Sequence, residues 1–199
     1  MKIAQTDSHA RPSASSPHVC PWWLGPLLTT PLRRLIDSPE RMLEPFVRPG
    51  MTVVEPGCGM GYFTLPMARL VGETGKVLAA DVQPKMLGGL MRRARRAGLD
   101  ARITPVQCQP GDAGLEAWPA AADVAVVIHM LHEVPDQAGL LRQLFGTLKP
   151  GGVLVFVEPK GHVTAADFQQ SLAAATAVGF VVTERVVRGR GLNAVLIRP

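Results

Sequence analysis

Two groups of residues have types and spacings that suit chemistry. The first is the stretch VVEPGCGMGYFT, residues 53–64, where Gly57, Gly59 and Gly61 alternate with other residues directly after an apolar run. Glycines in such a loop allow positive φ angles and the close approach of a ligand to the main chain. The carboxylate of Glu55 comes just before them. An acidic group at this place disfavours a pyrophosphate.

The second group is a set of ionisable side chains in two short segments. IHMLHEVPD, residues 128–136, and EPKGH, residues 158–162, supply three histidines, several carboxylates and a lysine. Two histidines separated by three residues are candidates for substrate binding or proton transfer. We interpret four of these side chains as candidate catalytic residues: His132, Glu133, His129 and Lys160. The alternatives are a helix cap for Glu133 and a solvated side chain for Lys160.

Alternating strands and helices would position both groups. Apolar runs predict strands at residues 51–56, 76–81, 101–107, 122–130 and 151–159, and helical spacing predicts helices at residues 62–72, 84–97, 137–148 and 164–178. Residues 179–199 read as two further strands about a glycine turn. The pattern predicts an α/β fold, a Rossmann-like doubly wound sheet. We expect it to be mostly parallel and seven-stranded, with an antiparallel C-terminal hairpin and helices on both faces.

Two carboxylates at predicted strand ends support a nucleoside ligand at the glycine loop. Asp81 ends the second strand, at the usual place for a carboxylate that accepts hydrogen bonds from ribose hydroxyls. Asp112, in the GDA segment after the third strand, is a candidate acceptor for an adenine amino group. A helix cap at Asp81 and a capped turn at Asp112 are the alternatives. A nicotinamide dinucleotide fits less well, because its G-x-G-x-x-G fingerprint needs glycine where Tyr62 stands.

Four segments in this order resemble the motifs of class I S-adenosylmethionine-dependent methyltransferases. VVEPGCGMG resembles the first motif of that family, LAADVQPKML the second, ADVAVVIHMLHEVPD the fourth-strand motif and LKPGGVLVFVEP the fifth. The likeness is greatest to the small-molecule branch that includes ubiquinone- and menaquinone-biosynthesis methyltransferases. The family more often has aspartate in a D-x-G setting, where this chain has Glu55-Pro56.

The resemblance implies S-adenosyl-L-methionine as cofactor, in-line methyl transfer to a small-molecule acceptor, and no metal. It places Glu55, Gly57, Cys58, Gly59 and Gly61 around the methionine and ribose, and Asp81 on the ribose. It places Val82 and Met86 beside the adenine, Asp112 and Ala113 at the adenine edge, and Ile128 and His129 near the methyl group. Two alternatives to a small-molecule methyltransferase remain open. One is a methyltransferase that acts on RNA or protein, and the other is a cofactor-binding module without catalytic activity.

The resemblance also suggests a division of the chain. We expect a flexible tail at residues 1–18, an N-terminal helical cap at residues 19–50 and a methyltransferase domain at residues 51–199. Cys20, Trp22 and Trp23 in the cap would form an apolar lid over the acceptor, unless that segment is a helix packed on the sheet. With Met130 and Leu131, the tryptophans favour an apolar acceptor.

Composition limits the class of protein without deciding it. The chain has 199 residues, 47% of them hydrophobic, and a formal net charge of +5. Three widely spaced cysteines indicate a reducing compartment rather than a disulfide framework. The sequence has no apolar run of the length of a membrane span and no signal-peptide pattern, so we expect a cytoplasmic protein.

Nucleic acid is a less favoured partner, although four arginines cluster at residues 92–96. They occupy the face of a predicted helix opposite its apolar stripe, which is a solvated face by default. The Asn/Asp-Pro-Pro-aromatic motif of base-amine methyltransferases is absent, and IHML stands in its place. The sequence makes no prediction about oligomeric state.

Overall fold

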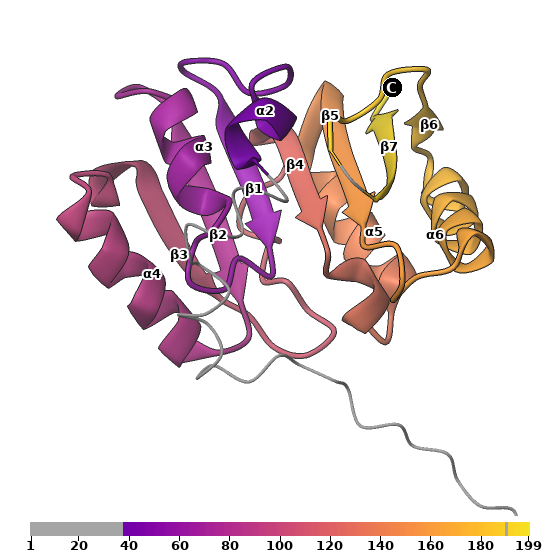
Figure 1. The fold of residues 1–199 in the computed structure, drawn as a ribbon, viewed down its shortest axis with the longest axis horizontal. Coiled ribbons are helices and arrows are strands. Elements are labelled where there is room, and N and C mark those ends of the chain that lie inside the picture. The colour runs from indigo at the N-terminus through magenta and orange to yellow at the C-terminus, as the bar shows by residue number, and fades with distance from the viewer. Residues whose placement is uncertain (1–37, 190) are drawn as a thin grey trace, which may run out of the picture.

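A computed structural model of the chain describes residues 38–189 and 191–199, and a seven-stranded sheet forms its centre (Figure 1). The strand order is β3-β2-β1-β4-β5-β7-β6. The strands are β1 Thr52–Pro56, β2 Lys76–Asp81, β3 Ile103–Gln107, β4 Ala122–Ile128, β5 Leu148–Glu158, β6 Val181–Val182 and β7 Leu192–Ile197. Neighbours among β1 to β5 pair in parallel, whereas β7 is antiparallel to β5 and β6. The predicted fold class is confirmed.

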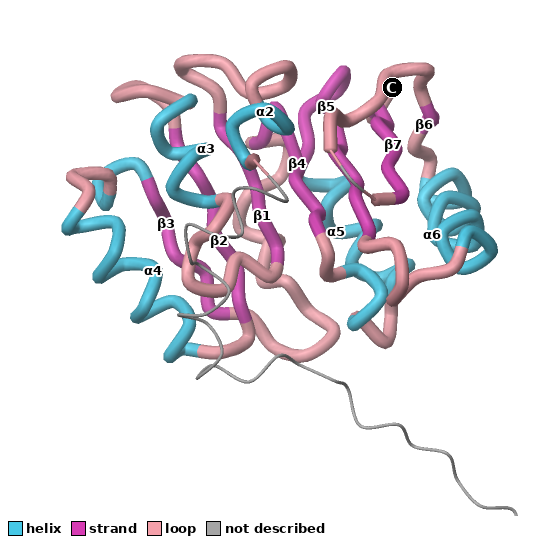
Figure 2. Tube along the Cα trace, viewed as in Figure 1, coloured by secondary structure: helices cyan, strands magenta, loops and turns pink. Residues whose placement is uncertain are grey.

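Helices cover both faces of the sheet, as Figure 2 shows. They are α2 Pro39–Leu43, α3 Thr64–Leu70, α4 Pro84–Arg96, α5 Gln137–Thr147 and α6 Ala165–Val178, with short 3₁₀ turns η3 Asp100–Arg102 and η4 Leu131–Glu133. Because successive strand residues point to opposite faces, Val53 packs with α2, α3 and α4 in one core, and Val54 packs with α5 and α6 in the other.

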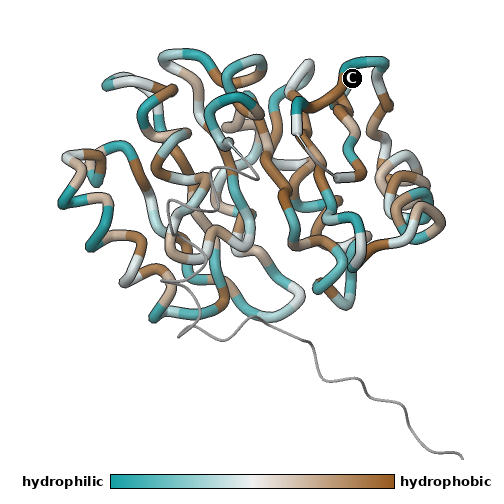
Figure 3. Tube along the Cα trace, viewed as in Figure 1, coloured by the Kyte–Doolittle hydropathy of each residue, from teal (hydrophilic) through white to brown (hydrophobic). Residues whose placement is uncertain are grey.

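The strands at the centre of the sheet are apolar along most of their length (Figure 3). In β4, residues 124–127 are buried without alternation, and residues 154–157 of β5 are buried likewise. A parallel strand that helices cover on both faces has no solvent side, so it needs no polar alternation. Strands β4 and β5, which lead into the segments 128–136 and 158–162, are therefore buried on both faces.

Helix ends follow the local chemistry. Pro84 begins α4, and Gly98 follows its end with a φ of 66°. Thr164 and Asp167 form a capping box at the start of α6, and Gly179 ends that helix with a φ of 118°. The predicted cap at Thr164 is confirmed.

The C-terminal hairpin is shorter than the sequence predicts. Only the two residues of β6 pair with β7, although two full strands were expected from residues 179–199. Beyond β6, the amide and the hydroxyl of Thr183 both donate to the carbonyl of Val195, and the Asn193 side chain accepts from the amide of Val187. Side-chain hydrogen bonds thus take over part of the role of a longer ladder.

Other element bounds also differ from expectation. The third strand begins at Ile103, because residues 100–102 form the 3₁₀ turn η3. The fifth strand begins at Leu148 rather than at residue 151, so it takes in the residue at which the preceding helix was expected to end.

Only part of the expected N-terminal cap can be compared with the structure. The tail at residues 1–18 and the lid residues Cys20, Trp22 and Trp23 lie outside the described residues. Helix α2 belongs to the expected cap, and its Met42 and Leu43 are buried in the core that α3 shares. Among the described residues, no helix has the length and apolar character needed to cross a membrane.

Candidate functional site

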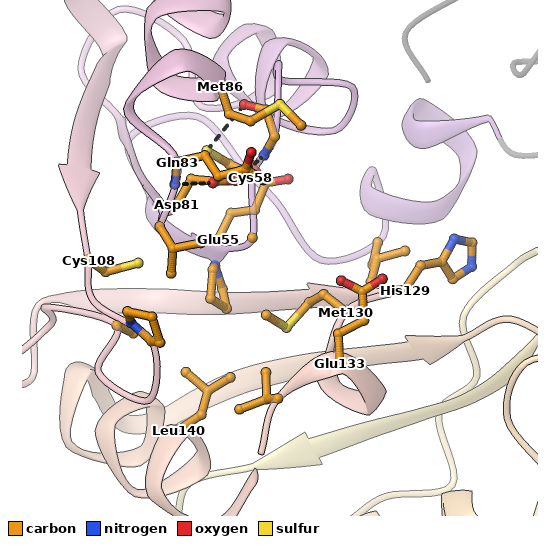
Figure 4. Close-up of a pocket in the computed structure, with 18 of the residues that line it drawn as sticks. Glu55, Cys58, Asp81, Gln83, Met86, Cys108, His129, Met130, Glu133 and Leu140 are labelled. Atoms are coloured by element: carbon orange, nitrogen blue, oxygen red, sulfur yellow. Dashed lines mark hydrogen bonds between the residues drawn. The ribbon is translucent and has the colours of Figure 1, made fainter. Parts of the chain in front are cut away.

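A cavity of about 500 Å³ opens at the carboxyl ends of the parallel strands (Figure 4). Its lining comes from the glycine loop after β1, the segments after β2 and β3, and the ends of β4 and β5. Ligands of open α/β sheets bind at this edge, where the strand order reverses between β1 and β4. The two sequence segments singled out for chemistry therefore meet at one cavity.

The three loop glycines have separate roles. Gly57, Gly59 and Gly61 all have positive φ angles, of 67°, 53° and 82°. A Cβ at Gly59 would meet no atom within 4 Å, whereas a Cβ at Gly61 would clash with the side chain of Leu90. Gly57 and Gly59 line the cavity, and Gly61 is not among the lining residues. Gly61 thus lets α4 pack against the loop rather than facing a ligand.

Asp81 ties the glycine loop to the end of β2. One carboxylate oxygen accepts from the amide of Gly59 at 2.8 Å, and the other accepts from the amide of Gln83 at 2.8 Å. Burial raises the pKa of Asp81, and these two backbone bonds oppose the rise. Because each carboxylate oxygen accepts more than one hydrogen bond, Asp81 can also receive ligand hydroxyls. It organises the turn before α4 while it lines the cavity.

Glu55 is a buried acid at the base of the site. Its side chain is 5% exposed and accepts a hydrogen bond of 2.5 Å from the hydroxyl of Thr64. Burial raises the pKa of Glu55 to about 8, the Thr64 bond lowers it, and the nearby charge of Asp81 raises it. Such an acid becomes a carboxylate readily when a cation enters the cavity.

The residues predicted to contact the adenine line the same cavity as Asp81. Val82, Met86, Asp112 and Ala113 all line the cavity. The Asp112 carboxylate accepts from the amide of Gly114, so it caps its own turn as the alternative interpretation held. Ala113 is fixed by its amide, which donates to the side chain of Gln143.

Two cysteines lie on this side of the cavity. Cys58 belongs to the glycine loop, and Cys108, which sequence reasoning did not select, directly follows β3. Burial raises the pKa of both thiols, so neither is a thiolate at neutral pH. Its position directly after a parallel strand is the signal that could have identified Cys108 from the sequence.

Strand β4 ends at Ile128 because His129 adopts a left-handed conformation with a φ of 57°. The amide of His129 still donates to the carbonyl of Val157 in β5, at 2.8 Å. In Figure 4 the His129 ring lies apart from Glu55 and Asp81, beyond Met130. Ile128, His129 and Met130 all line the cavity.

His132 is held by Glu158, a residue from the end of β5. The His132 ring nitrogen Nδ1 lies 2.6 Å from one carboxylate oxygen, and the His132 amide donates to the other at 3.1 Å. Glu158 is 1% exposed; burial raises the pKa of its carboxyl group, and His132 lowers it. Sequence reasoning named Glu158 beside His162 and Lys160 without pairing it to His132.

Of the other predicted catalytic residues, Glu133 lines the cavity and Lys160 does not. Glu133 lines the cavity, and burial raises the pKa of its carboxyl group. His162 also lines the cavity, with its ring centre 6.4 Å from that of His132. Lys160 is exposed and is not among the lining residues.

The remaining wall of the cavity is largely apolar. Tyr62, Phe63, Val134, Pro135 and Leu140 contribute to it. Within residues 38–189 and 191–199, neither lysine nor arginine lines the cavity, and histidine, cysteine and carboxylate side chains form no group of three with metal-binding geometry.

Comparison with known proteins identifies the family of the matched region. Residues 48–184 match the model of a family described as a methyltransferase domain. The ubiquinone/menaquinone biosynthesis C-methyltransferase UbiE of Klebsiella pneumoniae is 36% identical over 115 residues. That match covers 56% of this chain and 44% of the relative, so the chain spans less than half the length of this curated protein.

Solved structures share the fold. A SAM-dependent methyltransferase from Aquifex aeolicus superposes with a TM-score of 0.75 at 24% identity, covering 89% of this chain and 96% of that one. A putative rRNA-methylase from Clostridium thermocellum gives a TM-score of 0.61 at 22% identity, covering 79% and 90%. At these identities the structural likeness bears on the fold alone.

Proposed function

The chain belongs to the methyltransferase domain family, and from that premise we propose that it transfers a methyl group from S-adenosylmethionine to a small-molecule acceptor. The class I S-adenosylmethionine-dependent family predicted from the motifs is confirmed, and with it the cofactor of that family. The observation that carries the proposal is one cavity joining the glycine loop and Asp81 to the ends of β4 and β5.

The residues of the cavity fit this cofactor. S-adenosylmethionine supplies a methyl group on a sulfonium centre, which leaves as a neutral thioether. The buried acid of Glu55 suits the cationic methionine end, and the open face of Gly59 admits a ligand against the backbone. The carboxylate of Asp81 suits the ribose hydroxyls. The absence of lysine and arginine from the described lining is consistent with a ligand that carries no phosphate.

We assign the remaining contacts by their places in the cavity. Gly57 and Cys58 would lie along the methionine, Val82 and Met86 would flank the adenine, and Ala113 would meet its edge. Asp112, which already caps a turn, would offer its second oxygen to the adenine amino group. Ile128 and His129 would lie near the methyl group. Gly61 would act through packing.

The protein's part in methyl transfer is mostly positional. Holding an acceptor in line with the bond that breaks can supply roughly 7–11 kcal/mol of the barrier. The apolar wall made by Phe63, Val134 and Leu140 would keep water away from the methyl group. We assign to His132 and Glu133, which both line the cavity, the role of receiving a proton from the acceptor. Lys160, outside the cavity, is given no role.

The acceptor is proposed to be small and largely apolar. The wall residues support this, and so does the name of the UbiE relatives, which act in ubiquinone and menaquinone biosynthesis. A nucleic-acid acceptor has weaker support, because the cavity lining that the structure describes carries four carboxylates and neither lysine nor arginine.

Calorimetric titration with S-adenosylmethionine, S-adenosylhomocysteine and NAD tests the proposal. We expect the first two to bind at micromolar concentration and NAD not to bind. Asp81→Ala should weaken both sulfur ligands tenfold or more, because a hydrogen bond to a charged acceptor is worth about 1.5–3 kcal/mol. Glu184→Ala, which removes an exposed carboxylate, is the control. Binding of NAD alone would contradict the proposal, and unchanged affinity in Asp81→Ala would remove Asp81 from the site.

A further inference from the structure

Buried Glu158 and partly exposed His132 form a pair at the proposed acceptor end of the cavity. They are 26 residues apart in the chain and meet because β4 and β5 are parallel neighbours, with Ile128 opposite Val157. One oxygen of the Glu158 carboxylate accepts a hydrogen bond from the His132 amide. The other oxygen lies 2.6 Å from the ring nitrogen Nδ1 of His132. A single buried acid therefore fixes both the backbone and the ring of His132.

This arrangement selects one protonation form of the imidazole. The His132 amide can only donate, so the Glu158 oxygen that it meets is an acceptor. With Glu158 ionised, the second oxygen is an acceptor too, and Nδ1 must carry the hydrogen. When the imidazole is neutral, Nε2, on the other side of the ring, is therefore its unprotonated nitrogen, and His132 lines the cavity. A carboxylate on Nδ1–H is the arrangement that prepares histidine to accept a proton at Nε2.

We propose that Glu158 is a positioning residue that holds His132 as a general base, and that the acceptor is a neutral molecule with an acidic hydroxyl of phenol or enol type. The inference rests on the proposed methyl transfer. The acceptor O–H bond breaks and its proton goes to Nε2. The freed electron pair, on the oxygen or on the conjugated carbon, bonds to the methyl carbon. The carbon–sulfur bond breaks with its pair left on sulfur.

The charges around His132 argue for a neutral acceptor. Glu133 lies on the same 3₁₀ turn, Glu158 ends β5, and His162 lies in the segment after β5. Further along the cavity is Asp81, and within the described part of the chain no lysine or arginine lines it. A carboxylate or phosphate on the acceptor would meet these acidic side chains with no lysine or arginine to pair with. A hydroxyl that ionises only as its proton reaches His132 avoids that repulsion.

The hydrogen position on His132 is measurable without cofactor or acceptor. We would record nitrogen-15 spectra of histidine-labelled protein over a pH series, read the neutral form of the ring, and assign the His132 signals by their loss in His132→Gln. We expect Nδ1 to be protonated and Nε2 to be unprotonated. The opposite form would mean that Glu158 donates to the ring, which would overturn the proposal. Because this measurement does not depend on cofactor binding, it can contradict the role of Glu158 without contradicting the proposed methyl transfer, and the reverse also holds.

Glu158→Gln tests the positioning role with little change of shape. The new amide oxygen must stay on the His132 amide, which leaves the amide NH₂ facing Nδ1. Nδ1 then becomes the acceptor, and we expect the hydrogen to move to Nε2. Asp123→Asn is the matched control, because Asp123 also lies 2.6 Å from its partner, Lys149, but at the opposite end of β4. A His132 ring that keeps Nδ1–H in Glu158→Gln would contradict the proposal.

Two probe molecules test the acceptor class on protein saturated with S-adenosylhomocysteine. Catechol carries acidic hydroxyls and no charge, whereas phenyl phosphate has a similar ring with an anion. We expect catechol to shift the His132 ring signals in the wild-type protein at least tenfold more strongly, at equal concentration, than phenyl phosphate. Equal or stronger shifts with phenyl phosphate, or no shift with catechol, would overturn the assignment of the acceptor.

Discussion

Glu55 has a clear pH signature. Its pKa is raised by burial to about 8 from an ordinary 4.5, so the folded protein holds a proton that the unfolded chain loses above pH 4.5. The stability associated with this proton is full below pH 4.5, falls as the pH rises and is lost above about pH 8. Glu55→Gln keeps an acceptor for Thr64 but has no proton to lose.

We therefore expect Glu55→Gln to be more stable than the wild type at pH 9, by on the order of 4 kcal/mol, and equally stable at pH 4. Urea unfolding at the two pH values measures the difference. In the same variant S-adenosylmethionine should bind more weakly, because the ligand's positive charge loses its partner. A stability difference independent of pH would show that Glu55 ionises normally in the folded protein.

Proton release on binding gives an independent check of Glu55. If a cationic ligand turns the neutral acid into a carboxylate, the wild type should release up to one proton near pH 7. Affinity should then rise roughly 20-fold between pH 6 and pH 7.5. Calorimetry in two buffers of different ionisation enthalpy measures this release, and Glu55→Gln should abolish it.

The glycine loop and α4 act as one element. Arg93, one of the four clustered arginines, donates to the carbonyl of Met60 in the loop, and Leu90 packs where a Cβ at Gly61 would stand. Arg93 thus contributes to the architecture of the site. The exposed arginines 92, 95 and 96 remain a solvated face.

Two glycine substitutions in this loop should affect different properties: one mainly the stability of the fold, the other mainly cofactor binding. Gly61→Ala should destabilise the fold by roughly 2–4 kcal/mol, because the new methyl group meets the fully buried Leu90 and φ stays positive. Gly59→Ala should cost only about 1–2 kcal/mol but weaken cofactor binding strongly, since its methyl group would project into open space in the cavity. Thermal unfolding and calorimetry on both variants measure the two effects. The prediction is wrong if Gly59→Ala binds S-adenosylmethionine normally.

Local signals account for what the sequence could predict at this scale. The strand at residues 76–81 and the helix from Pro84 were found because apolar runs, proline and glycine mark their limits. The Glu158–His132 pair could not be found, because it depends on β4 and β5 being neighbours in a particular register. The packing role of Gly61 depends likewise on where Leu90 falls in three dimensions. Lys160 was selected by proximity in sequence, yet the segment after β5 leaves it exposed.

In the whole molecule the cavity joins two halves of the sheet. The glycine loop, Asp81 and Asp112 lie at or after the ends of β1 to β3, whereas His129 and His132 follow β4 and Glu158 ends β5. The formal charge of the chain is +5, yet the cavity lining that the structure describes contains neither lysine nor arginine. A ligand that reaches from one half to the other should stabilise both.

S-adenosylhomocysteine and adenosine test this bridging role as a matched pair of ligands. At 100 times its dissociation constant, S-adenosylhomocysteine should add about 2.7 kcal/mol to the free energy of unfolding, which corresponds to a rise of roughly 5–10 °C in Tm. Adenosine at the same concentration should raise Tm less, because it lacks the amino-acid part that would extend from Asp81 towards β4. Hydrogen exchange should show protection of residues 131–133 with S-adenosylhomocysteine and not with adenosine. If residues 131–133 were protected equally by both ligands, or by neither, the amino-acid part of the cofactor would not be what reaches the β4 end of the cavity.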